Sequence, residues 1–277
     1  MVLVADSGST KIDWALIDRN KKVSSFISRG CNPYFMTEKQ VFSLFCLVRN
    51  NMPSSNIEKI FFYGAGCTGG EKNKMIENAL HAAFGEKCKT EVQSDMLGAA
   101  RALCGRKEGI ACILGTGSNS CLFDGKDIVA NTPPLGFILG DEGSGAHLGK
   151  LLVGNILKGK CPNDIKEKFI EKYGAKEEII DKVYRQPFPN RWLAELSYFI
   201  KDNLGDETIK NMVEEAFSLF VDRNVTNYKR PDLKINIIGS IAHVYEEIIR
   251  KVIIDKQLVP GTITRSPIEG LIAYHNE

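Results

Sequence analysis

The sequence lacks an excess of charge of either sign, and this absence excludes a large class of functions. Its 277 residues carry 36 Lys and Arg against 34 Asp and Glu, a formal net charge of +2. A protein that binds nucleic acid by neutralising phosphates needs a basic surface, so we expect no nucleic-acid partner. Apolar residues make up 43% of the chain and charged residues 25%, which is ordinary for a folded globular protein and argues against wholesale disorder.

Long apolar runs and cysteine motifs are also missing. No apolar run approaches the roughly 18 residues that a membrane-spanning helix needs, so we expect no membrane contact. The apolar start Met1–Ala5 meets Asp6 at once and has no basic residues before it, so no secretory signal is predicted. The eight cysteines form no CxxC pair and have no histidine at zinc-ligand spacing. We therefore expect reduced thiols in a cytoplasmic protein.

An internal repeat is the most informative feature of what is present. Residues 2–28 are predicted to form a strand, a polar glycine turn, a strand, a turn and a third strand. The same order returns at residues 110–130, about 109 residues later. The repeat predicts two lobes that begin alike, each presenting a polar glycine loop to a shared cleft.

The rest of the chain alternates helical and extended patterns, which predicts an α/β fold. Thr37 is a plausible N-cap for the first helix. Helical periodicity predicts helices at 37–49, 71–84, 96–103, 191–201, 207–227 and 241–255, and a short final helix after Pro267. Further strands are predicted at 57–63, 90–92 and 234–238, the last of these being the final strand. We expect an N-terminal lobe of residues 1–106 joined by 266–277, and a C-terminal lobe of residues 107–265 with a helix-rich insertion at about 150–228.

The first polar loop, Asp6 to Lys11, has the composition of a phosphate cradle. Gly8 lets the backbone approach a ligand closely, and the hydroxyls of Ser9 and Thr10 with successive N–H groups can surround phosphate oxygens. Asp6 ends the preceding strand, where a carboxylate can hold Mg²⁺ directly or through water. Taken alone, the segment is equally typical of an ordinary tight hairpin.

A second loop at the equivalent place in the repeat strengthens this interpretation. It comprises Gly115, Thr116, Gly117, Ser118 and Asn119. Two such loops related by the repeat predict a phosphate clamp rather than two unrelated turns. Neither loop is a Walker A sequence, and the last glycine of a dinucleotide-binding GxGxxG is missing, so a dinucleotide fold is disfavoured.

Four further positions have both a structural and a functional interpretation. Asp95 can be a helix N-cap or a general base for an attacking hydroxyl. Asp141 and Glu142, adjacent carboxylates among glycines, can cap a helix or accept hydrogen bonds from substrate hydroxyls. Asn32 before Pro33 can start a turn or bind sugar hydroxyls. Gly239–Ser240 can be a plain strand-to-helix turn or a nucleotide contact at a strand end.

Four segments occur in an order that resembles a known superfamily. They are Asp6–Lys11, Gly115–Asn119 within LGTGSN, Gly140–Ser144 with the sequence GDEGS, and Gly239–Ser240. Together they resemble the sugar kinase, Hsp70 and actin superfamily, over essentially the whole chain. Within it the chain is most similar to the N-acetylglucosamine kinase branch, grouped with the BadF/BadG/BcrA/BcrD-type ATPases.

This resemblance implies a two-lobed actin-like ATPase (ribonuclease H-like) fold, each lobe a β-sheet flanked by helices, with ATP and an amino sugar in the cleft. It implies Asp95 as catalytic base and Asp6 on the Mg²⁺ side of the phosphates, with Lys11 adding positive charge nearby. The phosphate cradle and adenosine contacts would be Gly8, Ser9, Thr10, Gly115, Thr116, Gly117, Gly239 and Ser240. The sugar would be bound by Asn32, Ser118, Asn119, Gly136 and Asp141.

The implied reaction is ATP-dependent phosphorylation of the 6-hydroxyl of an amino sugar, with N-acetylglucosamine as the expected substrate. Glucosamine and N-acetylmuramic acid are alternative substrates, and a homodimer is expected from the family. A second hypothesis is an ATPase that activates a partner enzyme. Members of that kind carry a cluster-binding cysteine directly before the second phosphate loop, where Leu114 stands here. A third hypothesis is a binding module that senses a sugar or nucleotide without chemistry.

Overall fold

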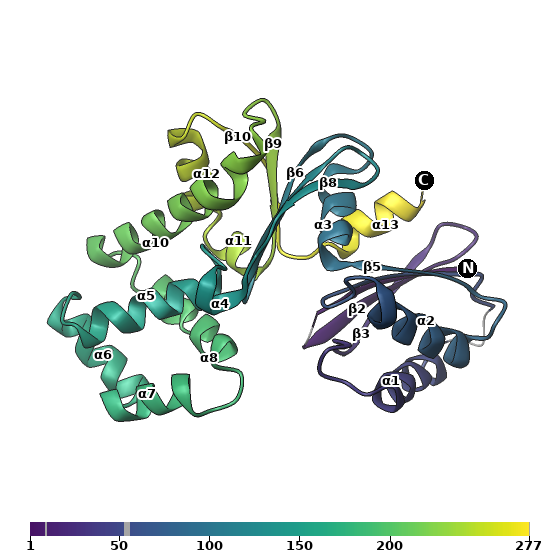
Figure 1. The fold of residues 1–277 in the computed structure, drawn as a ribbon, viewed down its shortest axis with the longest axis horizontal. Coiled ribbons are helices and arrows are strands. Elements are labelled where there is room, and N and C mark those ends of the chain that lie inside the picture. Colours follow the sequence, from purple (N-terminus) through teal and green to yellow (C-terminus); the bar gives the residue numbers. More distant parts are fainter. Residues whose placement is uncertain (9, 53–55, 277) are drawn as a thin grey trace. The chain divides into compact units, whose positions relative to one another are not determined.

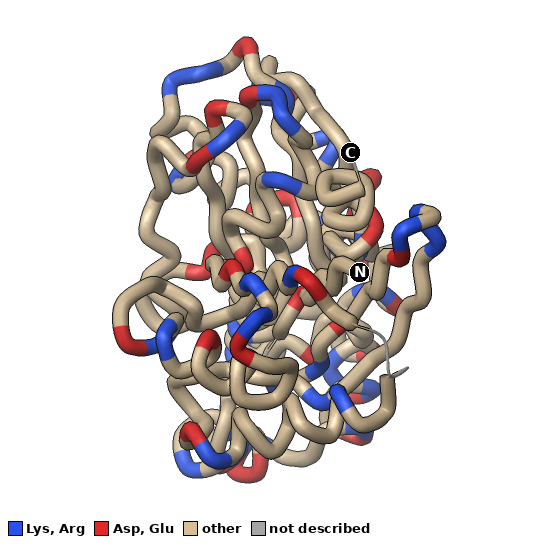
Figure 2. The backbone as a smooth tube through the Cα atoms, turned by 90° about the vertical axis from the view of Figure 1, so that its right-hand side faces the viewer, with Lys and Arg blue, Asp and Glu red and all other residues tan. Residues whose placement is uncertain are grey.

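The computed structural model describes residues 1–8, 10–52 and 56–276 and contains two compact units. Unit 1 comprises Met1–Arg106, Gly125–Asp127 and Pro267–Glu277, and unit 2 comprises Lys107–Asp124 and Ile128–Ser266. Each unit contains one five-stranded mixed sheet with helices packed on it (Figure 1). Basic and acidic residues are interspersed along the backbone (Figure 2), so the small net charge is not the sum of a basic and an acidic region.

The sheet of unit 1 has the strand order β3-β2-β1-β4-β5. Its strands are β1 (Val2–Ser7), β2 (Lys11–Ile17), β3 (Val23–Arg29), β4 (Lys59–Gly64) and β5 (Lys89–Ser94). The first three form the predicted antiparallel meander, whereas β4 and β5 run parallel to β1. The carboxyl ends of β1, β4 and β5 therefore lie at the same edge of the sheet, where ligands commonly bind in α/β folds.

Helices cover both faces of this sheet (Figure 1). Alternate residues of β1 point to opposite faces: Leu3 packs in the core under α1 and α2, and Val4 packs on the side of α3 and α13. This two-sided burial explains why β1 is a continuous apolar run. The predicted N-cap is confirmed, because Thr37 and Gln40 form a capping box. The helices are α1 (Glu38–Asn50), α2 (Gly70–Phe84), α3 (Asp95–Cys104) and α13 (Ile268–Asn276).

Unit 2 repeats the same pairing scheme with the strand order β10-β9-β6-β7-β8. Its strands are β6 (Gly109–Leu114), β7 (Ser118–Phe123), β8 (Ile128–Thr132), β9 (Lys234–Ile238) and β10 (Val259–Thr264). The antiparallel meander β6-β7-β8 and the parallel neighbours β9 and β10 match those of unit 1. The internal repeat is thus confirmed, and it extends to all five strands.

Two sequence predictions for unit 2 strands were wrong. The final strand is β10, not the strand at 234–238, and it escaped notice because Pro260 and Gly261 weaken its strand pattern. Its pairing with β9 is irregular between Pro260 and Ile263, as is common on an edge strand. Ser118 and Asn119 were expected in a loop, but β7 begins at Ser118.

The helices of unit 2 pack on the sheet through the predicted apolar stripes, with residues such as Phe217 and Phe220 buried. They are α4 (Gly136–Leu139), α5 (Gly145–Leu157), α6 (Asn163–Tyr173), α7 (Lys176–Tyr184), α8 (Pro189–Glu195), α9 (Ser197–Asp202), α10 (Glu207–Phe220), α11 (Ser240–Val244) and α12 (Glu246–Asp255).

Three predicted helices are interrupted. The 191–201 helix breaks at Leu196, the 241–255 helix breaks at Tyr245, and the 207–227 helix loses its α-helical hydrogen bonding after Phe220.

Two further expectations from the sequence concern membrane helices and cysteines. Within the described ranges, no helix is both long enough and apolar enough to cross a membrane. All eight cysteine thiols are reduced, as predicted, and most of them are buried as small apolar side chains.

Candidate functional site

In unit 1 the first polar loop is a tight turn held by backbone hydrogen bonds. The N–H of Gly8 donates to the Lys11 carbonyl at 2.9 Å, and the N–H of Gly30 donates to the Thr10 carbonyl at 2.9 Å. The carbonyl of Gly8 accepts from the N–H of Cys31 at 3.2 Å. The loop is therefore fixed to the start of the segment after β3. Ser9, also expected in the phosphate cradle, lies outside the described residues.

A second carboxylate, Asp13, stands beside Asp6 and was missed by the sequence analysis. The two residues are directly opposite in the β1–β2 pairing, so their side chains share one face of the sheet. Like charges in that position destabilise a sheet, and the charge of Lys11 compensates: its Nζ lies 2.7 and 3.0 Å from the Asp13 carboxylate oxygens. The register of the hairpin was the signal that could have found Asp13.

Burial and the neighbouring carboxylates favour the protonated form of the Asp6 carboxyl group. Burial, then the charges of Asp13 and Asp95, raise its pKa to about 7, and the charge of Lys11 opposes this rise. A cation placed here would favour the ionised form. In the part of the chain that the structure describes, no three His, Cys, Asp or Glu side chains are grouped to enclose a metal ion. Mg²⁺ needs no such cage, because one or two carboxylates with water and phosphate suffice, and Asp6 with Asp13 fits that donor set.

Asp95 is the first residue of α3 and follows β5 directly. The helix N-cap is Ser94, whose Oγ accepts from the N–H of Leu97 at 3.2 Å, so the capping interpretation of Asp95 was wrong. The Asp95 carboxylate accepts from the N–H of Met96 at 2.9 Å. Burial raises its pKa, against the opposing effect of that hydrogen bond. A half-buried carboxylate of raised proton affinity directly after a strand suits a general base.

Asn32 lies beside a loop that sequence analysis left unassigned. Its Oδ1 accepts from the N–H of Tyr34 at 3.0 Å, which is the turn-initiating role expected of Asn before Pro. A Cβ atom on Gly66, in the segment after β4, would lie 2.6 Å from the same oxygen. The segments that follow β3 and β4 are thus packed together at the edge of the sheet that carries Asp6 and Asp95.

In unit 2 the second polar loop is joined to the start of α5. The N–H of Gly115 donates to the Gly117 carbonyl at 2.9 Å and closes the turn. The carbonyls of Gly115 and Thr116 accept from Gly145 and Ala146 at 2.9 and 3.1 Å. The loop therefore lies against a helix N-terminus, a place that favours negative charge.

Asp141 reaches this loop from a distant segment. Its Oδ1 accepts from the N–H of Ser118 at 3.2 Å, and a Cβ atom on Gly117 would lie 2.9 Å from its Oδ2. Burial raises the pKa of Asp141, and the Ser118 hydrogen bond opposes this. Asn119 follows on β7, and its Oδ1 accepts from the Ser120 N–H and the Asn131 Nδ2, both at 2.9 Å.

Gly136 and Gly239–Ser240 complete the predicted set in unit 2. Gly136 opens the short exposed helix α4, and its carbonyl accepts from Gly140 at 2.8 Å. Gly239 has φ +132°, and a Cβ atom there would collide with the carbonyl of Leu114, the last residue of β6. Ser240 begins α11 directly after it. The structure thus brings the Gly115–Asn119, Asp141 and Gly239–Ser240 segments together at one edge of the unit 2 sheet.

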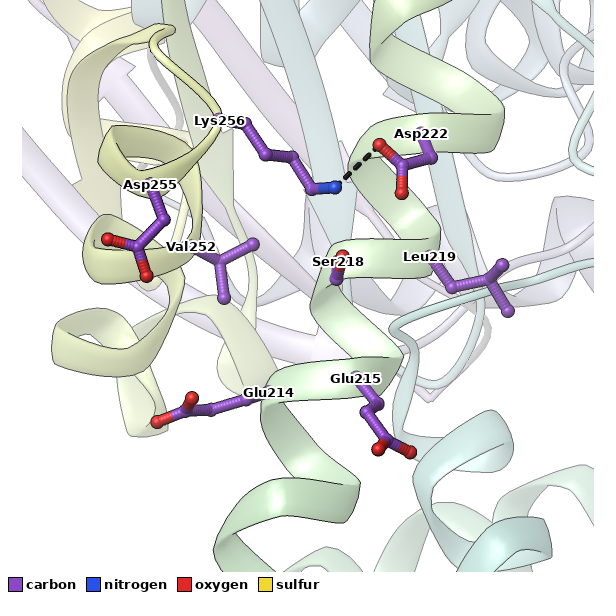
Figure 3. Close-up of a pocket in the computed structure, with 8 residues that line it drawn as sticks. All are labelled: Glu214, Glu215, Ser218, Leu219, Asp222, Val252, Asp255 and Lys256. Atoms are coloured by element: carbon purple, nitrogen blue, oxygen red, sulfur yellow. Dashed lines mark hydrogen bonds and ion pairs between the residues drawn. The ribbon is translucent and has the colours of Figure 1, made fainter.

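A surface hollow in unit 2 lies away from these segments. It has a volume of about 500 Å³ and lies between α10 and α12, with Glu214, Glu215, Asp222 and Asp255 on its walls (Figure 3). It contains none of the predicted site residues. Each unit by itself thus has a candidate set of polar strand-end segments: those with Asp6, Asp13 and Asp95 in unit 1, and those with Gly115–Asn119 and Asp141 in unit 2.

Comparison with known proteins gives matches among solved structures. No family model and no curated protein sequence matches the chain. A Porphyromonas gingivalis protein provisionally named N-acetylglucosamine kinase is 47% identical, with a TM-score of 0.94 over 100% of this chain and 99% of that one. A Chromobacterium violaceum protein of the same provisional name is 14% identical, with a TM-score of 0.75 over 99% and 98%. Spiroplasma citri MreB5, solved with ADP, is 11% identical, with a TM-score of 0.54 over 99% and 94%. The latter two show the fold alone, which confirms the predicted actin-like architecture.

Proposed function

Since the chain belongs to the N-acetylglucosamine kinase-like family of actin-fold sugar kinases, we propose that it transfers the γ-phosphate of ATP to the 6-hydroxyl of N-acetylglucosamine. The observation that carries the proposal is the 47% identity to the Porphyromonas gingivalis protein over the full length of both chains. The Asp95 carboxylate supports the same chemistry, because burial raises its pKa and it follows a strand of the sheet that also carries the Asp6–Lys11 loop.

The nucleotide is proposed to bind to strand-end loops in both units. Phosphoryl transfer asks the protein mainly to position groups and to neutralise charge, and Mg²⁺ bound to ATP supplies much of that neutralisation. Asp6, with Asp13 beside it, is proposed to hold the Mg²⁺. Lys11 is paired with Asp13, so its charge acts through that carboxylate. The proposed phosphate and adenosine contacts are Gly8, Ser9, Thr10, Gly115, Thr116, Gly117, Gly239 and Ser240.

Asp95 is proposed to accept the proton of the sugar 6-hydroxyl as the hydroxyl oxygen attacks phosphorus. Burial raises the pKa of this carboxyl above its ordinary value, which increases its strength as a base. In unit 2, Asp141 is proposed to accept hydrogen bonds from sugar hydroxyls. The remaining proposed sugar contacts are Asn32, Ser118, Asn119 and Gly136.

The test is ADP release with Mg-ATP and a panel of sugars: N-acetylglucosamine, glucosamine, N-acetylmuramic acid, N-acetylmannosamine and glucose. We expect N-acetylglucosamine to stand well above the ATP-only background. Asp95→Asn is expected to abolish that signal while leaving nucleotide binding intact, and the exposed Asp164→Asn serves as the matched control.

Each alternative has its own result in this assay. A higher rate with glucosamine or N-acetylmuramic acid would keep the kinase and change its substrate. ADP release that ignores the sugar would replace the proposal with a partner-activating ATPase. ATP binding without any release would favour a sensing module and contradict the proposal.

A further inference from the structure

The segment after α10 leaves regular helical geometry at a place where it meets the unit 2 site. Val221–Val225 forms a π-helical turn and Thr226–Tyr228 a 3₁₀ turn. Side chains add hydrogen bonds to this turn: Thr226 Oγ1 and Asn227 Nδ2 each donate to the carbonyl four residues earlier, at 2.6 Å. Such π-turns are frequent at functional sites.

Two side chains of the π-turn, Arg223 and Asn224, bind Glu142, the residue that follows Asp141. Glu142 is only 5% exposed, and its Oε1 lies 2.8 Å from the guanidinium of Arg223. Its Oε2 accepts from Asn224 Nδ2 at 3.3 Å. The two adjacent carboxylates therefore have different partners: Asp141 accepts from the N–H of Ser118, and Glu142 binds the π-turn.

A third side chain binds the strands that carry Asn119. The hydroxyl of Tyr228 lies 2.7 Å from Ser120 Oγ and accepts from the N–H of Thr132 at 3.0 Å. Thr132 Oγ1 in turn donates to the carbonyl of Asn224 at 3.0 Å. The side chains of Arg223, Asn224 and Tyr228, named the brace below, thus hold both the Asp141 segment and the β7–β8 pair.

Stability alone is a weak reason for this arrangement. A buried carboxylate must recover a desolvation cost, and a well-packed apolar side chain would often serve stability equally well. Geometry gives a better reason, because Asp141 has φ +55°, in the left-handed region that few residues other than glycine adopt, although Asp tolerates it better than most. Glu142, bonded to the brace, fixes the next peptide unit and with it the direction of the Asp141 carboxylate.

We propose that the brace is a positioning element for sugar recognition: Arg223 and Asn224 aim Asp141 through Glu142, and Tyr228 aims Asn119 through Ser120. The inference rests on the proposed function for the identity of the ligand. The geometric part, that the brace holds the Asp141 and Ser118 backbone in place, is independent of it.

The chain offers a matched control on the same turn. Asp222 directly precedes Arg223, but its carboxylate is directed across to α12, where Lys256 Nζ lies 2.6 Å away (Figure 3). Asp222→Asn therefore removes a short ion pair from the π-turn without touching either sugar segment. Any effect common to Asp222→Asn and Arg223→Gln belongs to the turn as a whole.

The experiment compares Glu142→Gln, Arg223→Gln, Tyr228→Phe and Asp222→Asn with the unaltered protein. In steady-state assays, the first three are expected to raise the sugar KM by roughly tenfold, the effect of a lost or misplaced hydrogen bond to substrate, with the ATP KM unchanged. The double variant Glu142→Gln/Arg223→Gln should raise the sugar KM no further than the single variants do, because both substitutions remove the same ion pair. Asp222→Asn should match the unaltered protein.

Amide hydrogen exchange gives a readout that needs no activity. Glu142→Gln and Arg223→Gln should speed exchange at Ser118 and Asp141, and Asp222→Asn should not. An unchanged sugar KM with unchanged exchange would overturn the inference, as would sugar and ATP KM values that rise together or an equal effect of Asp222→Asn. If the unaltered protein phosphorylates no sugar, the proposed function fails, and the exchange data alone decide whether the brace positions these residues.

Discussion

Acid is expected to weaken the docking of the C-terminal helix on unit 1, because α13 brings a neutral histidine into a basic and aromatic environment. His275 stacks on Phe61 with ring centroids 3.6 Å apart, and its Nε2 lies 2.8 Å from the hydroxyl of Tyr63. That hydroxyl already accepts from Arg101 at 2.8 Å, so its own proton points to His275. A neutral His275 ring with an unprotonated Nε2 accepts that proton and satisfies both groups.

The size of the effect follows from the pKa of His275. Burial, then the charges of Arg101, Lys59 and Arg106, lower it to about 3 from an ordinary value of 6.5. Below pH 6.5 the unfolded chain binds a proton that the folded state refuses, so stability is present above that pH and is lost as the pH falls toward 3. Between pH 7 and pH 5 the loss is about 2 kcal/mol, and it depends only on the unfolded pKa while the folded value stays well below 5.

The measurement is urea unfolding at pH 7, 6 and 5 for the chain and for His275→Gln. Trp14 is fully buried in unit 1 and reports on that unit, provided that Trp192 of unit 2 is replaced by Phe in both proteins. Gln keeps an acceptor for Tyr63 but cannot bind a proton. It should lower the free energy of unfolding at pH 7 through lost stacking on Phe61.

The quantity to compare is the difference in the free energy of unfolding between the unaltered chain and His275→Gln at each pH. Other titrating groups cancel in it, so the advantage of His275 over Gln should shrink by about 2 kcal/mol from pH 7 to pH 5. A difference that stays constant over this range would refute the protonation argument. A difference that grows toward pH 5 would mean that the folded state binds the proton more tightly than the unfolded chain.

Three further predictions concern the site. Asp95→Asn should lower turnover roughly 100- to 10,000-fold, with little change in the Kd for ATP measured by calorimetry. A rate near that of the unaltered enzyme would show that Asp95 is not the base. Gly239→Ala should destabilise unit 2 by roughly 2 to 4 kcal/mol in thermal melts, because Gly239 has φ +132° and the new methyl group would collide with the Leu114 carbonyl. An unchanged Tm would show that the turn can relax. Asp6 has a raised pKa of about 7, so in magnesium-free buffer its ionisation costs stability as the pH rises from about 4 to 7. Asp6→Asn should therefore gain stability relative to the unaltered chain over that window, and a gap independent of pH would contradict the Asp6 shift.

Local patterns were enough to predict the frame of each unit. The repeated strand-turn-strand pattern, the Thr37 cap and the buried stripe of α10 depend on residues within a few positions of one another. Chain continuity also places a loop directly at the end of each predicted strand. Asp6, Asp95 and the segment from Gly115 were identified for this reason, as polar residues at or just after the end of a predicted strand.

Contacts between distant segments were decided by the tertiary structure. β10 is a strand only because β9 offers it an edge. The sequence could not separate the roles of Asp141 and Glu142, since the partner Asn224 lies 82 residues beyond Glu142.

The sequence by itself therefore determined which elements form and which polar residues stand at their ends, because propensity, periodicity and capping act over one or two turns of chain. Tertiary structure alone decided which of these residues meet. Tyr63 and His275, 212 positions apart, form a hydrogen bond because both elements bury their apolar faces in the same core. Such partners are selected by packing and by the need to satisfy buried polar groups, and no short window of sequence contains that information.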